Sequence, residues 1–266
     1  MTANRRSRDS IANTLIVAVS LSLVCSVLVA GTAVLLKPQQ LRNEADYRQR
    51  IILDVAGLAK PDNDSGDAFA GIEVRMIELS TGKFVDSPSA EGFDATAAAG
   101  DPGLGIAIPA ELDIAGIRRR ARFAPVYLVR DGDAIEQIIL PIYGSGLWST
   151  MYGYLALEND ANTVRGLRFY RHAETPGLGD QVDKPSWRAQ WRGKKLFGDD
   201  GALRIEVIRG TVADDVTQMR QAGNYQVDGL AGATLTGRGV TSMIHYWVGA
   251  HGFGPYLDRV SSEQQR

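Results

Sequence analysis

Cysteine is nearly absent from this chain, and that absence excludes a class of chemistry. Of 266 residues only Cys25 is a cysteine, and it lies inside a long apolar run. The residues after it can form no cysteine-based metal or redox site, and they suit an oxidising compartment. We interpret Cys25 as a small apolar residue of the run. A lipoprotein cysteine is disfavoured, because Val24 stands where a small residue is expected.

An excess of positive charge is also missing. The chain has 29 Lys and Arg against 31 Asp and Glu, a net charge of −2, so no nucleic-acid partner is expected. The run Arg118 to Arg120 is short and lacks interleaved aromatics, and we interpret it as a solvated face leading into a strand. No catalytic or metal constellation is expected either. The three histidines (His172, His245 and His251) are interpreted as ordinary polar or half-buried residues.

One segment lacks charge altogether. Residues 11–36 contain no charged side chain, and this run exceeds the roughly 20 residues with which a helix crosses a bilayer. It is longer than the apolar region of a signal peptide, so an uncleaved anchor is predicted. Arg5, Arg6 and Arg8 precede it and favour a cytoplasmic N-terminus, with the later residues outside the cytoplasm. Charge counting alone leaves the orientation open, because basic residues also follow the run: Lys37, Arg42, Arg48 and Arg50.

The residues after this apolar run predict an α+β domain that consists mainly of antiparallel sheet with flanking helices. Apolar spacing predicts a helix from Gln39 to about Lys60, and residues 61–66 are predicted to form a loop. Residues 72–85 predict a hairpin that turns at 80–82, and residues 87–105 a mobile connection. Strands are predicted at 126–129 and 138–142, joined by the turn "RDGD", with two more in "YGYLALEND" and "TVRGLRFYRHAE". The last predicted element is a helix in "GVTSMIHYWVGAHGF", ending near Gly249 or Gly252. We divide the chain into 1–37 (tail and anchor), 38–130 (membrane-proximal part) and 131–266 (ligand-binding domain).

A glycine-rich loop with hydroxyl residues, "VDGLAGATLTGRGV", enters this last helix. The N-terminus of a helix suits an anion. A P-loop is excluded because Arg238 and Gly239 stand where Lys and Ser/Thr belong. No dinucleotide fingerprint opens an early β-α-β unit. Thr234 has no neighbouring base to make it a nucleophile, while a simple glycine-rich cap with Thr236 as N-cap remains open.

The segment Asp228 to Thr234, "DGLAGAT", resembles the flavinylation motif of FMN-binding domains. The resemblance implies that a separate flavin transferase attaches FMN through its phosphate to the hydroxyl of Thr234. Ala231 departs from the pattern, because Ser or Thr is usual there. The resulting diester would carry one negative charge, and we expect backbone N–H groups at 236–240 to solvate it.

The resemblance extends along nearly the whole chain. "DGDAIEQIILPIYGSGLWSTMYGYLAL", "AETPGLGDQV", "WRAQWRGKKLF" and "GFGPYL" occur in an order similar to that of the C subunits of the sodium-translocating NADH:quinone oxidoreductases. This implies a subunit that relays electrons inside a multi-subunit membrane complex and itself binds neither NADH nor quinone. Two alternatives remain: the G subunit of the related electron-transport complex, and a membrane-anchored sensor module that binds its ligand reversibly.

Two further glycine-rich loops are candidates for the flavin site, "YGSGLWST" and "ETPGLG". Both are also compatible with tight turns on the core, and the resemblance favours the flavin. Trp187, Trp191, Lys194 and Lys195 are interpreted as structural or partner-facing. The predicted cofactor-binding residues are Thr234 (covalent), Gly232, Ala233, Leu235, Thr236, Gly146, Leu147, Trp148, Glu174, Thr175, Gly177 and Leu178.

Overall fold

The structure is a computed structural model that describes residues 10–59, 65–212 and 223–264. It divides into two units, residues 1–47 and residues 48–266. Helix α1 (Ile11–Val55) runs from the first unit into the second. In the described residues it is the one helix long and apolar enough to cross a membrane. The sequence predicted two helical segments here, and the structure joins them through Pro38.

Helix α1 ends at Val55, before the predicted end near Lys60, because of Gly57. Gly57 has a φ of +71°, which a residue without Cβ adopts readily. The N–H of Gly57 donates to the carbonyl of Asp54, and that of Leu58 donates to Leu53 at 2.8 Å. This pair of bonds is the Schellman arrangement that closes a helix.

An antiparallel sheet of six strands forms the centre of the second unit, in the order β2-β1-β5-β6-β7-β8. This confirms the predicted hairpin, the "RDGD" turn and the two later strands, and the strands on either side of the "RDGD" turn are longer than predicted. The strands are β1 (Ile72–Glu78), β2 (Lys83–Val85), β5 (Phe123–Asp131), β6 (Ala134–Ser145), β7 (Thr150–Glu158) and β8 (Val164–Arg171).

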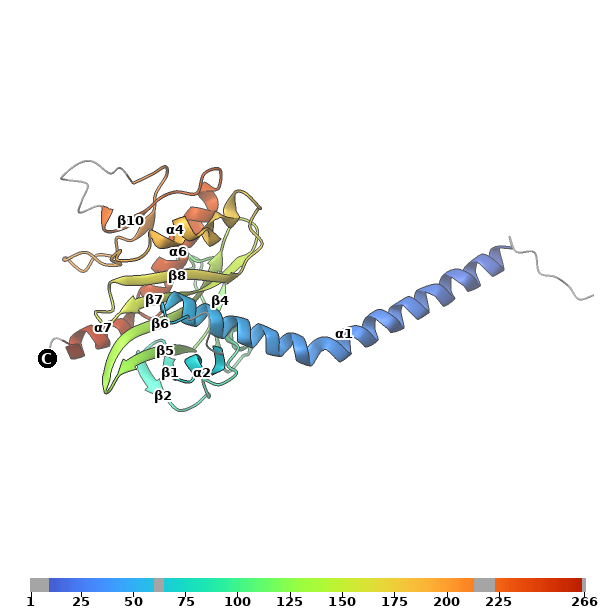
Figure 1. The fold of residues 1–266 in the computed structure, drawn as a ribbon, viewed down its shortest axis with the longest axis horizontal. Coiled ribbons are helices and arrows are strands. Elements are labelled where there is room, and N and C mark those ends of the chain that lie inside the picture. The colour runs from blue at the N-terminus through green and yellow to red at the C-terminus, as the bar shows by residue number, and fades with distance from the viewer. Residues whose placement is uncertain (1–9, 60–64, 213–222, 265–266) are drawn as a thin grey trace, which may run out of the picture. The chain divides into compact units, whose positions relative to one another are not determined.

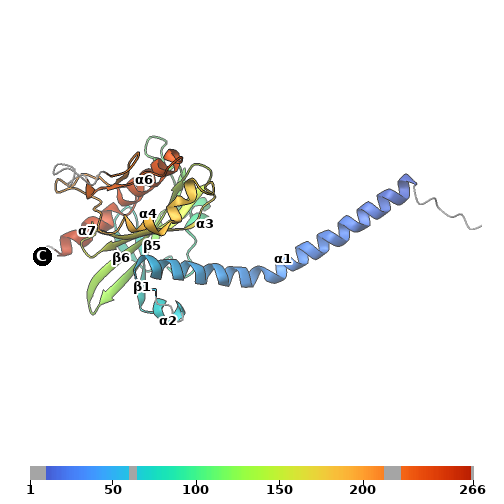
Figure 2. The same ribbon diagram turned by 45° about the horizontal axis from the view of Figure 1, so that its top comes forward.

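Both faces of this sheet are covered. In β6 the residues from Gln137 to Leu140 are all buried, as expected for a strand packed on two sides. Ile139 packs on one face with Ile51 and Ile52 of α1 and with α2 (Ser65–Phe69). The other face carries helix α6 (Thr234–Val248), which contacts β6. Figures 1 and 2 show the sheet between these elements.

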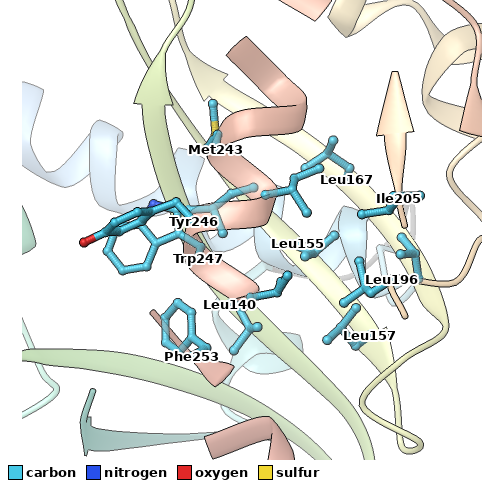
Figure 3. Packing of buried hydrophobic residues seen from close by; sticks show 14 of the residues in the cluster. Leu140, Leu155, Leu157, Leu167, Leu196, Ile205, Met243, Tyr246, Trp247 and Phe253 are labelled. Atoms are coloured by element: carbon cyan, nitrogen blue, oxygen red, sulfur yellow. The ribbon is translucent and has the colours of Figure 1, made fainter. Parts of the chain in front are cut away.

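Helix α6 supplies the centre of the larger core. Met243 and Trp247 belong to one cluster with the leucines of β6 and β7, and Leu196 and Ile205 lie across this cluster from Trp247 (Figure 3). The indole Nε1 of Trp247 donates to the carbonyl of Tyr143 at 2.6 Å, so its one polar atom is satisfied inside the core. The helix terminates at Gly249, as predicted. It is not the last element, because α7 (Gly254–Gln264) follows and packs Leu257 and Val260 into the same core.

Residues 87–105, predicted to be a mobile connection, contain an ordered helix, α3 (Ala95–Gly100). Asp94 caps it by accepting from the N–H groups of Thr96 and Ala97, a signal hidden among alanines and glycines. Next to α3 lies a ladder of β3 (Gly105–Ala107) and β4 (Arg119–Ala121). Arg120 corrects a second prediction: it is buried rather than solvated, and its guanidinium donates to the carbonyl of Ala121.

Short elements complete the second unit. The 3₁₀ helix η1 (Gly179–Asp183) leads into α4 (Pro185–Ala189), and β9 (Glu206–Val207) pairs in parallel with β10 (Gln226–Val227). Of the loop predicted at 61–66, residues 61–64 lie outside the described residues, and Ser65 and Gly66 belong to α2. The three domain boundaries drawn from the sequence stay predictions.

The hairpin turn between β1 and β2 rests directly on α7. Gly82 has a φ of +63°, and a Cβ there would overlap the backbone of Pro255 and Tyr256. Gly92 has a φ of +70° and nothing within 4 Å of the same position. We expect both alanine substitutions to cost about 1 kcal/mol of backbone strain. Gly82→Ala should cost about 1–3 kcal/mol more from the overlap. Urea unfolding of the detergent-solubilised protein measures the difference, and equal costs would show that the turn does not pack on α7.

Candidate functional site

Three loops that are distant in sequence meet at the end of the sheet. The first joins β6 to β7 and contains Gly146, Leu147 and Trp148. The second follows β8, and the third, residues 228–233, enters α6. The buried carboxylate of Glu174, on the second loop, contacts the first loop and the first turn of α6, which directly follows the third loop. The structure therefore brings together the three segments that the sequence singled out separately.

Glu174 accepts hydrogen bonds from the first loop and from the first turn of α6. Its Oε1 accepts the backbone N–H groups of Leu147 and Trp148 at 3.0 and 3.1 Å. Its Oε2 accepts the hydroxyl of Thr236 at 2.5 Å. Because the side chain is only 5% exposed, these bonds satisfy a group whose burial would otherwise be costly. A side chain on Gly146 would collide with this carboxylate and lie 2.8 Å from Met151 Sδ, which explains the glycine.

The two threonines of the helix start have different environments. Thr236 is buried, and its hydroxyl donates to Glu174. It is not the N-cap, which corrects one of the interpretations left open: α6 begins at Thr234, and the N-cap is Ala233, which offers no capping side chain. The helix start is thus two residues earlier than expected. Thr234 is exposed, and its hydroxyl has no hydrogen-bond partner in the described chain.

The second and third loops are also tied to each other directly. Nε2 of Gln181 donates to the carbonyls of Leu178 and Ala231, at 2.9 and 3.1 Å. Gly232 has a φ of +75°, and a Cβ there would lie 2.8 Å from Cδ2 of Leu178. Gly177 and Thr175 shape the second loop, because Gly177 has a positive φ and the carbonyl of Thr175 accepts from Leu178 at 3.1 Å. These contacts bring the loops close without covering Thr234.

Large apolar side chains lie exposed on the loops near Thr234. After Tyr47, the described residues contain five such side chains, and four are predicted site residues: Leu147 (42% exposed), Trp148 (69%), Leu178 (42%) and Leu235 (55%). Single exposed apolar residues are common on protein surfaces, whereas a group of them on adjoining loops marks a binding site. The fifth is Ile114, on a neighbouring loop.

A pocket of about 640 Å³ opens beside Thr234. It is lined by Gly232, Thr234 and Gly237 and by three exposed charged residues, the basic Arg209 and Arg238 and the acidic Glu206, so its charged lining is net positive. Arg238 lies one helical turn after Thr234, so both are on the same side of α6. Thr234 therefore stands between an apolar surface and a basic pocket, as suits a ligand with one apolar and one anionic end. The sequence analysis considered Arg238 only as a residue at the position of a P-loop lysine, and it did not single out Arg209.

A second layer holds the third loop in place, and sequence reasoning missed it. The N–H of Asp228 donates to Oε1 of Gln190, and Nε2 of Gln190 donates back to Oδ2 of Asp228, at 2.9 and 3.0 Å. The buried Trp187 donates its indole N–H to the carbonyl of Asp228 at 2.8 Å. Trp191 is fully buried, so both tryptophans are structural. Of the residues in these contacts, only Asp228 belongs to a motif that the sequence analysis had recognised.

His172 lies two residues before Glu174. Its Nε2 contacts Oδ2 of Asp183 at 2.8 Å, and this hydrogen bond raises the pKa of His172 above its ordinary value. Nε2 of His245 contacts the carbonyl of Ile205 at 2.6 Å. Lys194 donates to the carbonyl of Gly223, and burial lowers its pKa. The contacts of these three side chains therefore link neighbouring segments of the chain.

Comparisons with known proteins point to one family. A family model for the FMN-binding domain matches residues 146–249, which include all three loops. The C subunit of the Na(+)-translocating NADH-quinone reductase of Yersinia pestis is 48% identical, over 96% of this chain and 95% of its own. The corresponding subunit of Pseudomonas aeruginosa is 45% identical, over 94% and 96%. The chain belongs to the C-subunit family of these reductases. Neither of these relatives is a G subunit, the nearest alternative.

Solved structures of the C-subunit family share the fold. The crystal structure of Shewanella oneidensis NqrC matches 84% of this chain and 99% of its own, with a TM-score of 0.74 and 34% identity. The C subunit from Parabacteroides distasonis is similar in fold, with a TM-score of 0.58 at 24% identity.

The three-way contact at Glu174 predicts a specific loss of stability. Glu174→Ala leaves two N–H groups and a hydroxyl without their acceptor, and should lower the free energy of unfolding by about 2–4 kcal/mol. Glu174→Gln keeps one acceptor oxygen and should cost about 1 kcal/mol. The exposed Glu91, replaced by alanine, is the control and should change it by less than about 0.5 kcal/mol. Urea unfolding measures all three. Similar values for Glu174→Ala and Glu91→Ala would contradict a joining role.

Proposed function

We propose that this chain is a single-pass membrane subunit that carries FMN, joined through its phosphate to Thr234, and relays electrons within a sodium-translocating NADH:quinone reductase. One observation carries the proposal: the exposed, unpartnered hydroxyl of Thr234 stands where an apolar surface meets a basic pocket in the described part of the chain. The membership of the chain in the C-subunit family and the match to the FMN-binding domain support the same assignment.

The residues around Thr234 fit the two ends of FMN. Leu147, Trp148 and Leu178 offer apolar surface to the isoalloxazine. The phosphodiester carries one negative charge, which suits the first turn of α6, where backbone N–H groups lack intrahelical acceptors. Arg238 adds a positive charge on the same side of the helix. When bound, FMN supplies reversible one-electron chemistry; the chain holds and orients it.

The covalent bond would suit a relay, because a cofactor tied to its carrier keeps a high local concentration and is not lost between redox cycles. Electron transfer of this kind requires no general acid or base from the chain. The attachment step would be performed by a separate flavin transferase. Ala231 is exposed beside the acceptor, and only its carbonyl is engaged, by Gln181. We therefore expect flavin attachment at Thr234 to tolerate the missing hydroxyl at this position.

Helix α1 is the proposed membrane anchor. Its most apolar window has a mean hydropathy of 2.4, and none of that window is buried against the rest of the chain. The arginines before it favour a cytoplasmic N-terminus. The flavin domain would then lie in the periplasm of the inner membrane, and the other subunits of the reductase would be its partners.

Thr234 provides the direct test. The chain, coexpressed with a flavin transferase, should show yellow-green in-gel fluorescence after denaturation, and Thr234→Ala should abolish it. Thr234→Ser keeps an acceptor hydroxyl and should retain fluorescence. Thr236→Ala removes the other nearby hydroxyl and should retain it too, although losing the bond to Glu174 should cost about 1 kcal/mol of stability. Flavin that washes out on denaturation would favour a reversible binding module, and flavin that survives Thr234→Ala would place the bond elsewhere.

A further inference from the structure

A second pocket, of about 520 Å³, lies next to the flavin loops and takes no part in the assignment above. Its lining includes Tyr143 and Tyr152, whose rings stack at 5.6 Å between centroids. It also includes Gly116, Arg118 and Arg119. Beside it, the guanidinium of Arg171 lies 4.0 Å from the centroid of the Tyr152 ring.

Hydrogen-bond donors in and around this pocket lack acceptors. Nε of Arg119 donates to the carbonyl of Ala99, which leaves its terminal nitrogens unused. Within the described residues, no ion pair involves Arg118, Arg119 or Arg171. The three arginines are exposed, so they offer guanidinium N–H donors at this surface. A group that only accepts hydrogen bonds would satisfy them.

The nearby carboxylates are occupied by backbone groups. Asp113 accepts from the N–H groups of Ile117 and Arg118, at 2.9 and 2.7 Å. Asp94 caps α3, and Asp101 accepts from Gly103 and Leu104. The bonds to Asp113 hold Arg118 at a φ of +61°, a conformation that side chains rarely adopt. The loop is therefore fixed with its arginine exposed rather than free to fold back.

This pocket is continuous with the proposed flavin surface. Ser145, which precedes Gly146, donates its N–H to the carbonyl of Ala115 at 2.8 Å and its hydroxyl to that of Gly116 at 3.0 Å. These two bonds join residues 113–118, which we call the arginine loop, to the loop that bears Trp148. Ile114, the remaining exposed apolar side chain, lies at the start of the arginine loop. Exposed apolar groups with adjoining arginines form the composition typical of protein interfaces.

We infer that this surface, defined by Ile114, Arg118, Arg119, Trp148 and Arg171, docks an acidic surface of another subunit of the reductase. The inference rests on the proposed function, because docking here would bring a redox partner to the flavin. Asp or Glu side chains supply acceptors for the guanidinium forks of these arginines. A concave pocket suits projecting side chains of a protein better than the flat surface of anionic lipids.

The test uses the assembled complex with an affinity tag on a different subunit. Arg118→Glu is the informative variant, because its guanidinium makes no contact that the fold requires. Arg118→Gln removes the charge without reversing it, and Lys83→Glu makes the same charge change on the exposed edge strand β2. The measurements are covalent flavin by in-gel fluorescence, retention of this chain during potassium chloride washes, and the rate of NADH-driven flavin reduction and reoxidation.

We expect Arg118→Glu to keep its covalent flavin, to dissociate at lower salt, and to slow electron exchange about tenfold, with Arg118→Gln intermediate and Lys83→Glu unchanged. Loss of covalent flavin from the unmutated chain would overturn the proposed function instead. Unchanged retention and rates in Arg118→Glu would overturn the docking surface. So would equal losses in Lys83→Glu, or a dependence on anionic lipid in the surrounding nanodisc rather than on the partner subunit.

Discussion

The three hydrogen bonds of Glu174 are the constraint on which the site depends. One carboxylate accepts from the loop after β6 and from the first turn of α6, and it lies on the loop after β8 itself. Without it, three segments from distant parts of the chain would have no common partner. The environment of the carboxylate also separates two hydroxyls that look alike in sequence. Thr236 is buried against Glu174, which leaves Thr234 as the hydroxyl exposed to a ligand.

The sequence predicts much of the fold, because most of its strands carry unmistakable local patterns. The apolar run predicts β6, the "RDGD" turn predicts its pairing with β5, and apolar residues at helical spacing predict α6. Helix α3 was missed because its stabilisation comes from one aspartate at its cap rather than from periodicity. Arg120 was misjudged because the burial of an arginine depends on the tertiary fold, which its neighbours in sequence do not reveal.

At the site, sequence reasoning found the glycine-rich loops but not what joins them. Glycines are visible because a close approach excludes any Cβ, as at Gly146 and Gly232. The partners that make the approach necessary are ordinary polar residues, such as Gln181 and Gln190, whose contacts span 50 and 38 positions. No local pattern marks such residues. The placement of the flavin residues by resemblance therefore stays a prediction, whereas the meeting of the loops is a feature of the structure.

The position of the third loop, residues 228–233, depends more on buried aromatic surface than on ion pairs. Asp54, in the last turn of α1, pairs with Arg168 of β8 and with Arg188 of α4, but these side chains are roughly a quarter to a third exposed. Pairs of that kind contribute about 0–1 kcal/mol each. Trp187 of the same short helix is buried, which contributes about 2–3 kcal/mol, and its indole N–H binds the carbonyl of Asp228. The salt bridges therefore orient α4 against the end of α1, while the tryptophan holds α4 to the core.

Gln190 follows α4 directly and binds both the N–H and the carboxylate of Asp228, which fixes the start of the motif. Glu174 separately binds Thr236, in the first turn of α6. Along the chain Thr234 lies between Asp228 and Thr236, so its exposed hydroxyl is on a segment that is held on both sides.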